Sequence, residues 1–236
     1  TKFNQLSSLL FATSLALCSD AETDNNGVVT GEPTEAALVA FANSLSLNKN
    51  NLKAFQPRIG EVPFDSMRKM MTTVHDCSDR IVQYTKGAPD EILKRCTKCL
   101  DGGKVIELTD SKRNEILSKN KEFADKALRV LAGAYKELPS VPDEYDVSLE
   151  NGLIFIGLVG MIDPVRPEVK AAIDECKTAG IRPIMITGDH KDTAVAIAKQ
   201  LGIISDASEA ITGAQLNDLS DDEFLDAVEK YSVYAR

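Results

Sequence analysis

The chain has 236 residues, with 27 Lys and Arg against 36 Asp and Glu, so its formal net charge is −9. Apolar residues make up 43% and charged residues 27%, which is ordinary globular composition and excludes a disordered or collagen-like chain. Because the balance is acidic and no block of Lys and Arg occurs, a nucleic-acid-binding protein is disfavoured. An anionic ligand would therefore have to be held by a few cations placed at its site. The length of the chain allows one or two domains.

The two ends of the chain look like interior segments of a longer protein. Thr1 is not an initiator Met, and residues 231–236 read as an apolar strand with no turn after it, so we expect a piece of a larger chain. Residues 6–18 imitate a secretory signal peptide, but their leucines follow helical spacing, so a buried amphipathic helix is the better interpretation. No apolar run reaches the ~18 residues of a membrane span, so we expect this piece to be soluble.

The five cysteines are an odd number without the spacing of a disulfide framework, which indicates a reducing compartment. Cys96-Thr-Lys-Cys99 lacks the second ligand pair that a structural zinc site needs. We therefore expect free thiols near a helix end and no metal site.

Up to about residue 162 the sequence predicts a mixture of helices and strands. Pro33 suits the first turn of a helix, and the turn-rich residues 76–79 suit a hairpin between two strands. A continuous apolar run suits a central strand buried on both faces. The expected helices are 32–42, 90–96 and 112–132, and the expected strands are 72–75, 80–85, 130–135 and, as the central strand, 153–162.

After residue 167 the pattern changes to an alternation typical of a parallel, doubly wound sheet. We expect a helix over 168–179 ending at Gly180, a buried strand over 181–186 and a helix over 193–201 closed by Gly202. The two prolines and the charge pair at 163–167 suit a hinge. The sequence therefore predicts two domains, 1–162 and 163–236.

Three segments carry residues suited to phosphate or nucleotide chemistry. Thr187-Gly-Asp189 follows a strand of the predicted parallel sheet, where ligands bind, although a plain strand-to-helix turn is equally compatible. Lys86-Gly-Ala-Pro-Asp90 offers a cation and a glycine that lets a ligand approach the backbone, with a solvated lysine as the alternative. Phe64-Asp-Ser-Met-Arg68-Lys69 joins an aromatic ring to two cations, with a core Phe beside surface charges as the alternative.

His75 and His190 have no Ser, Cys or second His at a suggestive spacing, so the sequence offers no hydrolase triad.

The order of these motifs is more specific than any one of them. The chain carries, in sequence, Gly31-Glu-Pro-Thr-Glu-Ala-Ala-Leu38, Phe64-Asp-Ser-Met-Arg-Lys69, Lys86-Gly-Ala-Pro-Asp90, Leu128-Arg129, Met161-Ile-Asp-Pro-Val-Arg166 and Met185-Ile-Thr-Gly-Asp189. In this order the chain resembles the large cytoplasmic loop of P-type cation-transporting ATPases, and it is most like bacterial calcium pumps. The resemblance covers essentially the whole chain.

The resemblance implies an α/β (α+β) fold in two parts. Residues 1–162 would be the nucleotide-binding domain, an antiparallel sheet with flanking helices. Residues 163–236 would be part of the phosphorylation domain, a partial haloacid-dehalogenase-like, Rossmann-type parallel sheet.

The resemblance also implies a role for each motif residue. Phe64 would stack on adenine, Glu35 would bond near its amino group, and Lys69, Lys86 and Gly87 would line the pocket. Arg129 and Arg236 would reach the phosphates. Ser66 stands where some animal calcium pumps carry arginine, so one phosphate contact would be either lost or supplied by Arg68. Thr187, Gly188 and Asp189 would surround the γ-phosphate and Mg²⁺, and Asp163 and Arg166 would lie at the hinge.

The implied function is the ATP-binding part of a cation pump, in the first place for Ca²⁺, with ATP and Mg²⁺ as cofactors. The family's nucleophile, the Asp of Asp-Lys-Thr-Gly-Thr, is absent from the chain, as is its Gly-Asp-Gly-x-Asn-Asp loop, so we expect ATP or ADP binding without turnover. The transported cation would bind in a membrane domain outside this monomeric piece, on the cytoplasmic side of a membrane. Alternatives are a pump for another cation, a soluble dehalogenase-like phosphatase, for which no Asp-x-Asp motif is found, and a non-catalytic interaction module.

Overall fold

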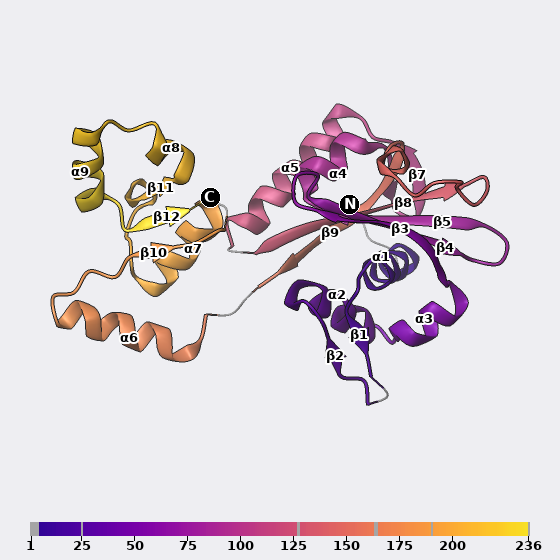
Figure 1. The fold of residues 1–236 in the computed structure, drawn as a ribbon, viewed down its shortest axis with the longest axis horizontal. Coiled ribbons are helices and arrows are strands. Elements are labelled where there is room, and N and C mark those ends of the chain that lie inside the picture. Colours follow the sequence, from indigo (N-terminus) through magenta and orange to yellow (C-terminus); the bar gives the residue numbers. More distant parts are fainter. Residues whose placement is uncertain (1–4, 25, 127, 163–164, 190, 236) are drawn as a thin grey trace. The chain divides into compact units, whose positions relative to one another are not determined.

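The computed structural model describes residues 5–24, 26–126, 128–162, 165–189 and 191–235 (Figure 1). They form two compact units, the first made of Thr1–Asn120 and Val130–Met161 and the second of Lys121–Arg129 and Ile162–Arg236. In these residues no helix combines the length and the apolar character needed to cross a bilayer. Asp163, expected at the hinge, His190 and Arg236 lie outside the described residues.

A seven-stranded mixed sheet forms the centre of the first unit. Its strands lie in the order β3 (Arg58–Asp65), β4 (Met70–Asp76), β5 (Ile81–Gly87), β8 (Arg129–Leu138), β9 (Leu153–Met161), β6 (Cys96–Asp101) and β7 (Lys104–Glu107). The hairpin expected at 72–85 is β4 and β5, and the central strand expected at 153–162 is β9 between β8 and β6. The resemblance implied an antiparallel sheet, but β6 and β9 pair in parallel. A long crossover connects them, as parallel neighbours require.

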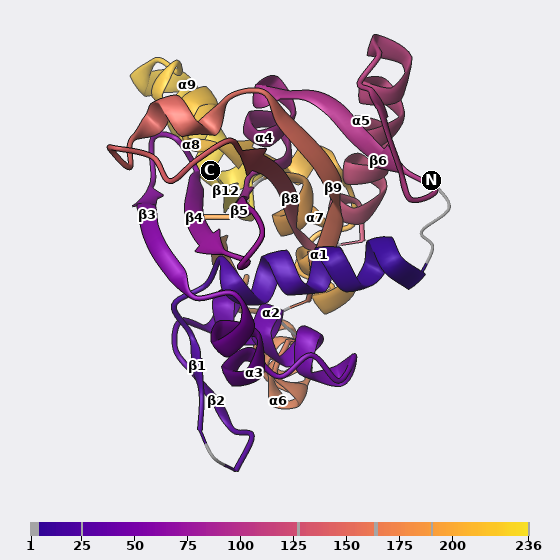
Figure 2. The same cartoon turned by 90° about the vertical axis from the view of Figure 1, so that its right-hand side faces the viewer.

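Helices cover both faces of this sheet (Figures 1 and 2). One face carries α1 (Gln5–Leu17), α2 (Pro33–Ser44) and α3 (Lys49–Phe55), and the other carries α4 (Pro89–Arg95) and α5, which begins at Asp110. A two-stranded ribbon, β1 (Glu22–Thr23) and β2 (Val29–Thr30), connects α1 to α2, and a short 3₁₀ helix, η1 (Val147–Glu150), precedes β9. The helices expected near 6–18, 32–42 and 90–96 are confirmed.

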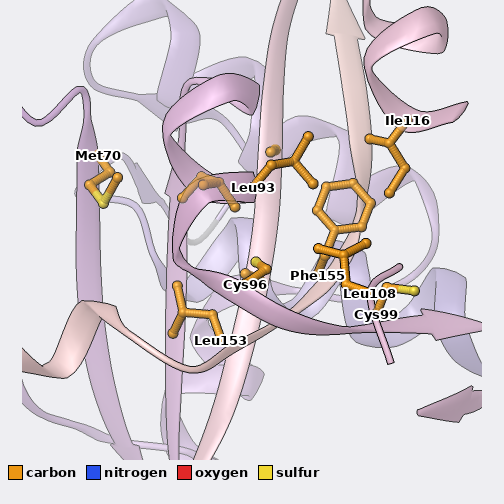
Figure 3. Packing of buried hydrophobic residues seen from close by; sticks show 11 residues of the cluster. Met70, Leu93, Cys96, Cys99, Leu108, Ile116, Leu153 and Phe155 are labelled. Atoms are coloured by element: carbon orange, nitrogen blue, oxygen red, sulfur yellow. The ribbon is translucent and has the colours of Figure 1, made fainter. Parts of the chain in front are cut away.

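Alternation along the strands divides the apolar side chains between two cores, because successive strand residues face opposite sides. Met70 belongs to the buried cluster that includes Leu93 of α4, Ile116 of α5 and Phe155 (Figure 3). Its neighbour Met71 faces the α1 side with Leu17. Both faces of the sheet are therefore buried, which explains why β9 reads as a continuous apolar run.

The helix expected over 112–132 is wrong at its end. The helix α5 spans Asp110–Ala124, and β8 begins at Arg129. Residues 132–138 pair with β5 over its whole length, so sheet pairing replaces the helical hydrogen bonds that the local periodicity favours. The edge strand β3 of this sheet and the helix α3 were not anticipated.

The second unit contains a three-stranded parallel sheet in the order β10 (Met185–Ile186), β12 (Val233–Ala235) and β11 (Ala210–Thr212). Its helices are α6 (Pro167–Thr178), α7 (Lys191–Leu201), α8 (Gly213–Asn217) and α9 (Asp221–Lys230). The helices expected over 168–179 and 193–201 are confirmed, and Gly180 and Gly202 follow them with positive φ.

The expectation of a buried strand over 181–186 is wrong. Only Met185 and Ile186 form a strand, and the Ile186 side chain is 81% exposed. Since β10 pairs with β12 and lies at the edge of the sheet, its apolar residues are not enclosed as those of a central strand would be.

Candidate functional site

A tight turn between β3 and β4 presents Phe64 and Lys69 to solvent. The carboxylate of Asp65 accepts hydrogen bonds from the backbone N–H groups of Met67 (3.0 Å) and Arg68 (2.8 Å). Lys69 has a φ of +55° and donates its N–H to the Asp65 carbonyl at 2.7 Å. Phe64 is 63% exposed, so the alternative of a core Phe is excluded. The turn holds an aromatic ring and a cation on the surface.

The guanidinium of Arg68 points back into the protein. It donates to the carboxylate of Glu150, which has no exposed surface, and through Nη2 to the Pro63 carbonyl at 2.6 Å. In this structure Arg68 therefore contacts protein groups at its two terminal nitrogens.

The start of the Lys86-Gly-Ala-Pro-Asp90 motif lies against this turn. The N–H of Ala88 donates to the Lys69 carbonyl at 2.9 Å, and Met70 pairs with Gly87 across the two strands. A Cβ on Gly87 would lie 2.4 Å from the Lys69 carbonyl oxygen, which is closer than real Cβ atoms come. Glycine is therefore required here by a close approach between two backbones.

Lys86 forms a nearly buried ion pair with Glu35, from the first turn of α2. Its ammonium also donates to the Ser19 hydroxyl at 3.0 Å. The second oxygen of the Glu35 carboxylate accepts from the N–H groups of Asp20 (2.7 Å) and Ala21 (3.2 Å). The alternative of a solvated lysine is excluded. The structure therefore brings the turn of residues 64–69 against residue 87, and residue 86 against residue 35, so that three sequence motifs meet.

Two further cations hold the loop that follows α1, and sequence reasoning did not find them. Lys49 is buried and donates to the carbonyls of Ser19 and Ala21, while Arg58 donates to those of Leu17 (2.9 Å) and Ser19 (2.7 Å). Cations stabilise the carbonyl end of a helix, and burial lowers the pKa of Lys49 to about 8. These two residues fix the position of Ser19, and with it that of the Lys86 ammonium.

The Thr187-Gly-Asp189 segment lies where the sequence predicts it, between β10 and α7. The Thr187 hydroxyl donates to the Asp189 carboxylate at 3.0 Å and accepts the Asp189 N–H at 3.1 Å, and the Thr187 N–H donates to the Tyr234 carbonyl. Arg129 is exposed, with its guanidinium 3.5 Å from Asp189 Oδ1. Arg166, expected at the hinge, is exposed at the start of α6.

Metal ligands are sparse in the described parts of the chain. No group of three or more His, Cys, Asp or Glu side chains there is arranged to hold a metal ion. Asp189 offers one carboxylate, which by itself does not make a Mg²⁺ site. Cys96 and Cys99 are free and buried in β6, and burial raises the pKa of Cys96 to about 12, as expected for an unreactive thiol.

The first unit is a mixed sheet with helices on both faces, and it carries Phe64, Lys69, Lys86 and Glu35. A family model described as "P-type ATPase, cytoplasmic domain N" matches residues 7–168. The chain belongs to the P-type ATPase family.

Curated relatives agree with this assignment. The chain is 48% identical over 96% of its length to calcium-transporting ATPase 1 of Bacillus cereus and 42% identical over its whole length to calcium-transporting ATPase 1 of Lactococcus lactis. It is 40% identical over 93% of its length to cation-transporting ATPase pma1 of Synechocystis. It spans about a quarter of the length of these relatives, namely 25%, 27% and 24%.

Proposed function

We propose that the first unit binds ATP or ADP and serves as the nucleotide-binding part of a cation pump. The observation that carries the proposal is that the turn exposing Phe64 and Lys69 packs against Gly87, which follows directly on Lys86 in its ion pair with Glu35. An exposed aromatic ring offers a stacking surface for a base, and cations beside it attract phosphates. The overall charge of −9 would repel an anionic nucleotide, so these local groups have to supply the attraction.

Each residue has a role that suits its environment. The Phe64 ring stacks on the adenine, and Lys69, whose side chain is exposed, meets the nucleotide's negative charge. Lys86 is held by Glu35, so it acts as a fixed positive charge at the pocket wall. Glu35 accepts from the adenine amino group only by sharing the oxygens that already bind Lys86 and the loop after α1.

Residues 163–236, which belong to the second unit, are proposed to be part of the phosphorylation domain, so that the domains are 1–162 and 163–236. Thr187, Gly188 and Asp189 would bind the terminal phosphate, Arg129 and Arg236 would assist, and Asp163 with Arg166 would form the hinge. Mg²⁺ would arrive with the nucleotide, whose phosphate oxygens complement the single Asp189 carboxylate. Since the chain contains no Asp-Lys-Thr-Gly-Thr nucleophile, we propose nucleotide binding without turnover.

In the whole protein, ATP hydrolysis through an aspartyl-phosphate would drive cation transport across a membrane, with these units on the cytoplasmic side. Calcium is proposed as the ion because relatives at 48% and 42% identity are named as calcium-transporting ATPases. A pump for another cation is the alternative, because a relative at 40% identity is named only as cation-transporting. We propose that the piece itself is monomeric.

Calorimetric titration of ATP into the wild-type chain, Phe64→Ala and Phe55→Ala tests the nucleotide site. Phe55 is the matched control, because it is also an exposed aromatic residue of the first unit, at the end of α3. Loss of a base–aromatic stack costs about 1–3 kcal/mol, so Phe64→Ala should bind about 5- to 150-fold more weakly. Phe55→Ala should bind as the wild type does. No binding by the wild type, or equal affinity in all three, would overturn the proposal.

A further inference from the structure

Glu150 is a buried acid that no nucleotide-site motif includes. It is the last residue of η1 and has no exposed surface. One carboxylate oxygen accepts from the Arg68 guanidinium and from the Thr72 hydroxyl at 3.2 Å. The other oxygen, Oε2, has no hydrogen-bond partner within the described part of the chain. A buried carboxylate is costly without a counter-charge, so the position of Arg68 is tied to that of Glu150.

The segment around Glu150, residues 145–151, which we call the strap, crosses and contacts four neighbouring strands, β3, β4, β5 and β8. Tyr145 packs on β3 so closely that a Cβ on Gly60 would lie 2.0 Å from its ring. The Leu149 carbonyl accepts from Gln83 of β5 at 2.9 Å, and the Asn151 carbonyl accepts from Lys136 of β8 at 3.0 Å. With Glu150 on β4, the strap is anchored along the sheet and provides a fixed support for Arg68.

Arg68 transmits this support to the site. Its Nη1 binds Glu150, and its Nη2 binds the Pro63 carbonyl, which is part of the peptide bond leading to Phe64. The rigid guanidinium fork therefore fixes the backbone directly before the exposed ring. The carboxylate of Asp65 fixes the backbone directly after it.

We propose that Glu150 is a positioning residue for nucleotide binding, which acts through Arg68 on the orientation of the Phe64 ring. The inference rests on the proposed nucleotide site and changes one part of it: Arg68 supports the turn and does not contact the phosphates. A ring held in its stacking position before the ligand arrives loses less freedom on binding, which strengthens binding without any new contact.

A double-mutant cycle on ATP affinity tests this inference. Glu150→Gln keeps the side-chain volume and an oxygen that can accept from Thr72, but it removes the charge that holds Arg68. It should weaken ATP binding about two- to tenfold, which lies at the lower end of the range found for coupled neighbours. In the Phe64→Ala background the same substitution should have no further effect, because the ring through which Glu150 acts is gone.

Two more variants complete the test. Glu137→Gln removes the exposed ion pair with Arg80 on the same sheet and should leave ATP affinity unchanged. Arg68→Lys keeps the charge facing Glu150 but loses the second N–H group directed at the Pro63 carbonyl, so it should weaken ATP binding about as much as Glu150→Gln. It also tests the proposal if Glu150→Gln fails to fold. Thermal melting identifies the folded variants.

The outcomes separate this inference from the proposed function. A wild-type chain that binds no ATP, or a Phe64→Ala variant that binds as the wild type does, overturns the nucleotide site itself. If Phe64→Ala weakens binding but Arg68→Lys and the folded Glu150→Gln do not, the positioning role is wrong. It is also wrong if their effects persist in full in the Phe64→Ala background, since a general structural disturbance would act in both.

Discussion

The ion pair between Lys86 and Glu35 connects the end of strand β5 to the first turn of helix α2. Because Glu35 also accepts two backbone N–H groups of the loop after α1, one carboxylate holds three separate segments of the first unit together. The same two side chains line the proposed nucleotide pocket. Stability and binding should therefore respond together when either is changed.

Replacing Lys86 by Met should lower both the free energy of unfolding and the affinity for ATP. The substitution leaves the Glu35 carboxylate nearly buried without its counter-charge, which should cost about 2–4 kcal/mol. Urea unfolding followed by circular dichroism measures the first effect and calorimetry the second. Lys94→Met is the control, because Lys94 pairs with Glu91 at the surface and should leave both quantities unchanged. Normal stability in Lys86→Met would show that the ion pair does not hold these segments together.

Gly87→Ala should be destabilising despite its small size. The added methyl group meets the Lys69 carbonyl oxygen at 2.4 Å and the Met70 side chain at 2.6 Å, so two paired strands must separate, at a cost of about 1–3 kcal/mol. Gly213→Ala adds the same group at the start of α8, where the nearest atom is 4.0 Å away, and should be tolerated. Equal unfolding midpoints for the two variants would contradict the close approach seen here.

Leu15 and Leu6, both in α1, should differ sharply in their contribution to the free energy of unfolding. Leu15 has no exposed surface, whereas Leu6 is 74% exposed on the same helix. Leu15→Ala should cost about 2–5 kcal/mol through lost burial and the cavity left behind, and Leu6→Ala no more than about 0.5 kcal/mol. Denaturant unfolding of both variants checks the difference. Similar values would mean that α1 does not pack against the sheet as described.

His75 should make the fold sensitive to mild acid. Burial lowers its pKa from 6.5 to about 4, and the neighbouring charges of Arg58 and Lys49 act in the same direction, while its hydrogen bond to the Gln56 carbonyl opposes them. Between these two pH values the unfolded chain binds more protons than the folded one. The stability due to His75 is therefore complete above pH 6.5 and is lost as the pH falls toward 4, by about 3 kcal/mol.

The measurement is the free energy of unfolding of the wild type and His75→Gln at several pH values from 4 to 7. Carboxylates titrate in the same window in both proteins, so the difference between the two isolates the imidazole. The wild type should lose its advantage over His75→Gln as the solution becomes acidic. A constant difference would show that His75 remains accessible to protons in the folded state.

The sequence predicted the motifs and their neighbouring elements because these depend on local patterns. The glycines that follow α6 and α7 and the proline at the first turn of α2 have local physical causes, and they lie where expected. The structural roles of Glu150, Lys49 and Arg58 could not be predicted from the sequence. An acid or a base in a polar segment gives the same sequence pattern whether its side chain is solvated or wholly or partly buried. Their burial depends on contacts across 30 or more positions, such as that of Lys49 with Ser19 and that of Glu150 with Arg68.

The missed strand β3 and the buried strand wrongly expected over 181–186 have a similar origin, because both depend on how strands pair. The strand β3 escaped notice because its pairing with β4 is interrupted between Arg58 and Gly60 and again between Val62 and Asp65, which disturbs the alternation of polar and apolar residues. The apolar residues 181–186 suggested burial, but hydrophobicity does not reveal which strand lies at a sheet edge.

The adjacent methionines of β4 have a consequence for insertions and deletions. Since Met70 and Met71 face opposite cores, a shift of one position between β4 and β5 would exchange the two faces of either strand. The same shift would turn the Lys86 side chain away from α2 and bring Thr85 into its place. Natural variants that change the length of the 77–80 turn by a single residue should therefore be rare. Length changes between β1 and β2 should be common, because among the described residues these two strands pair with each other and not with the large sheet.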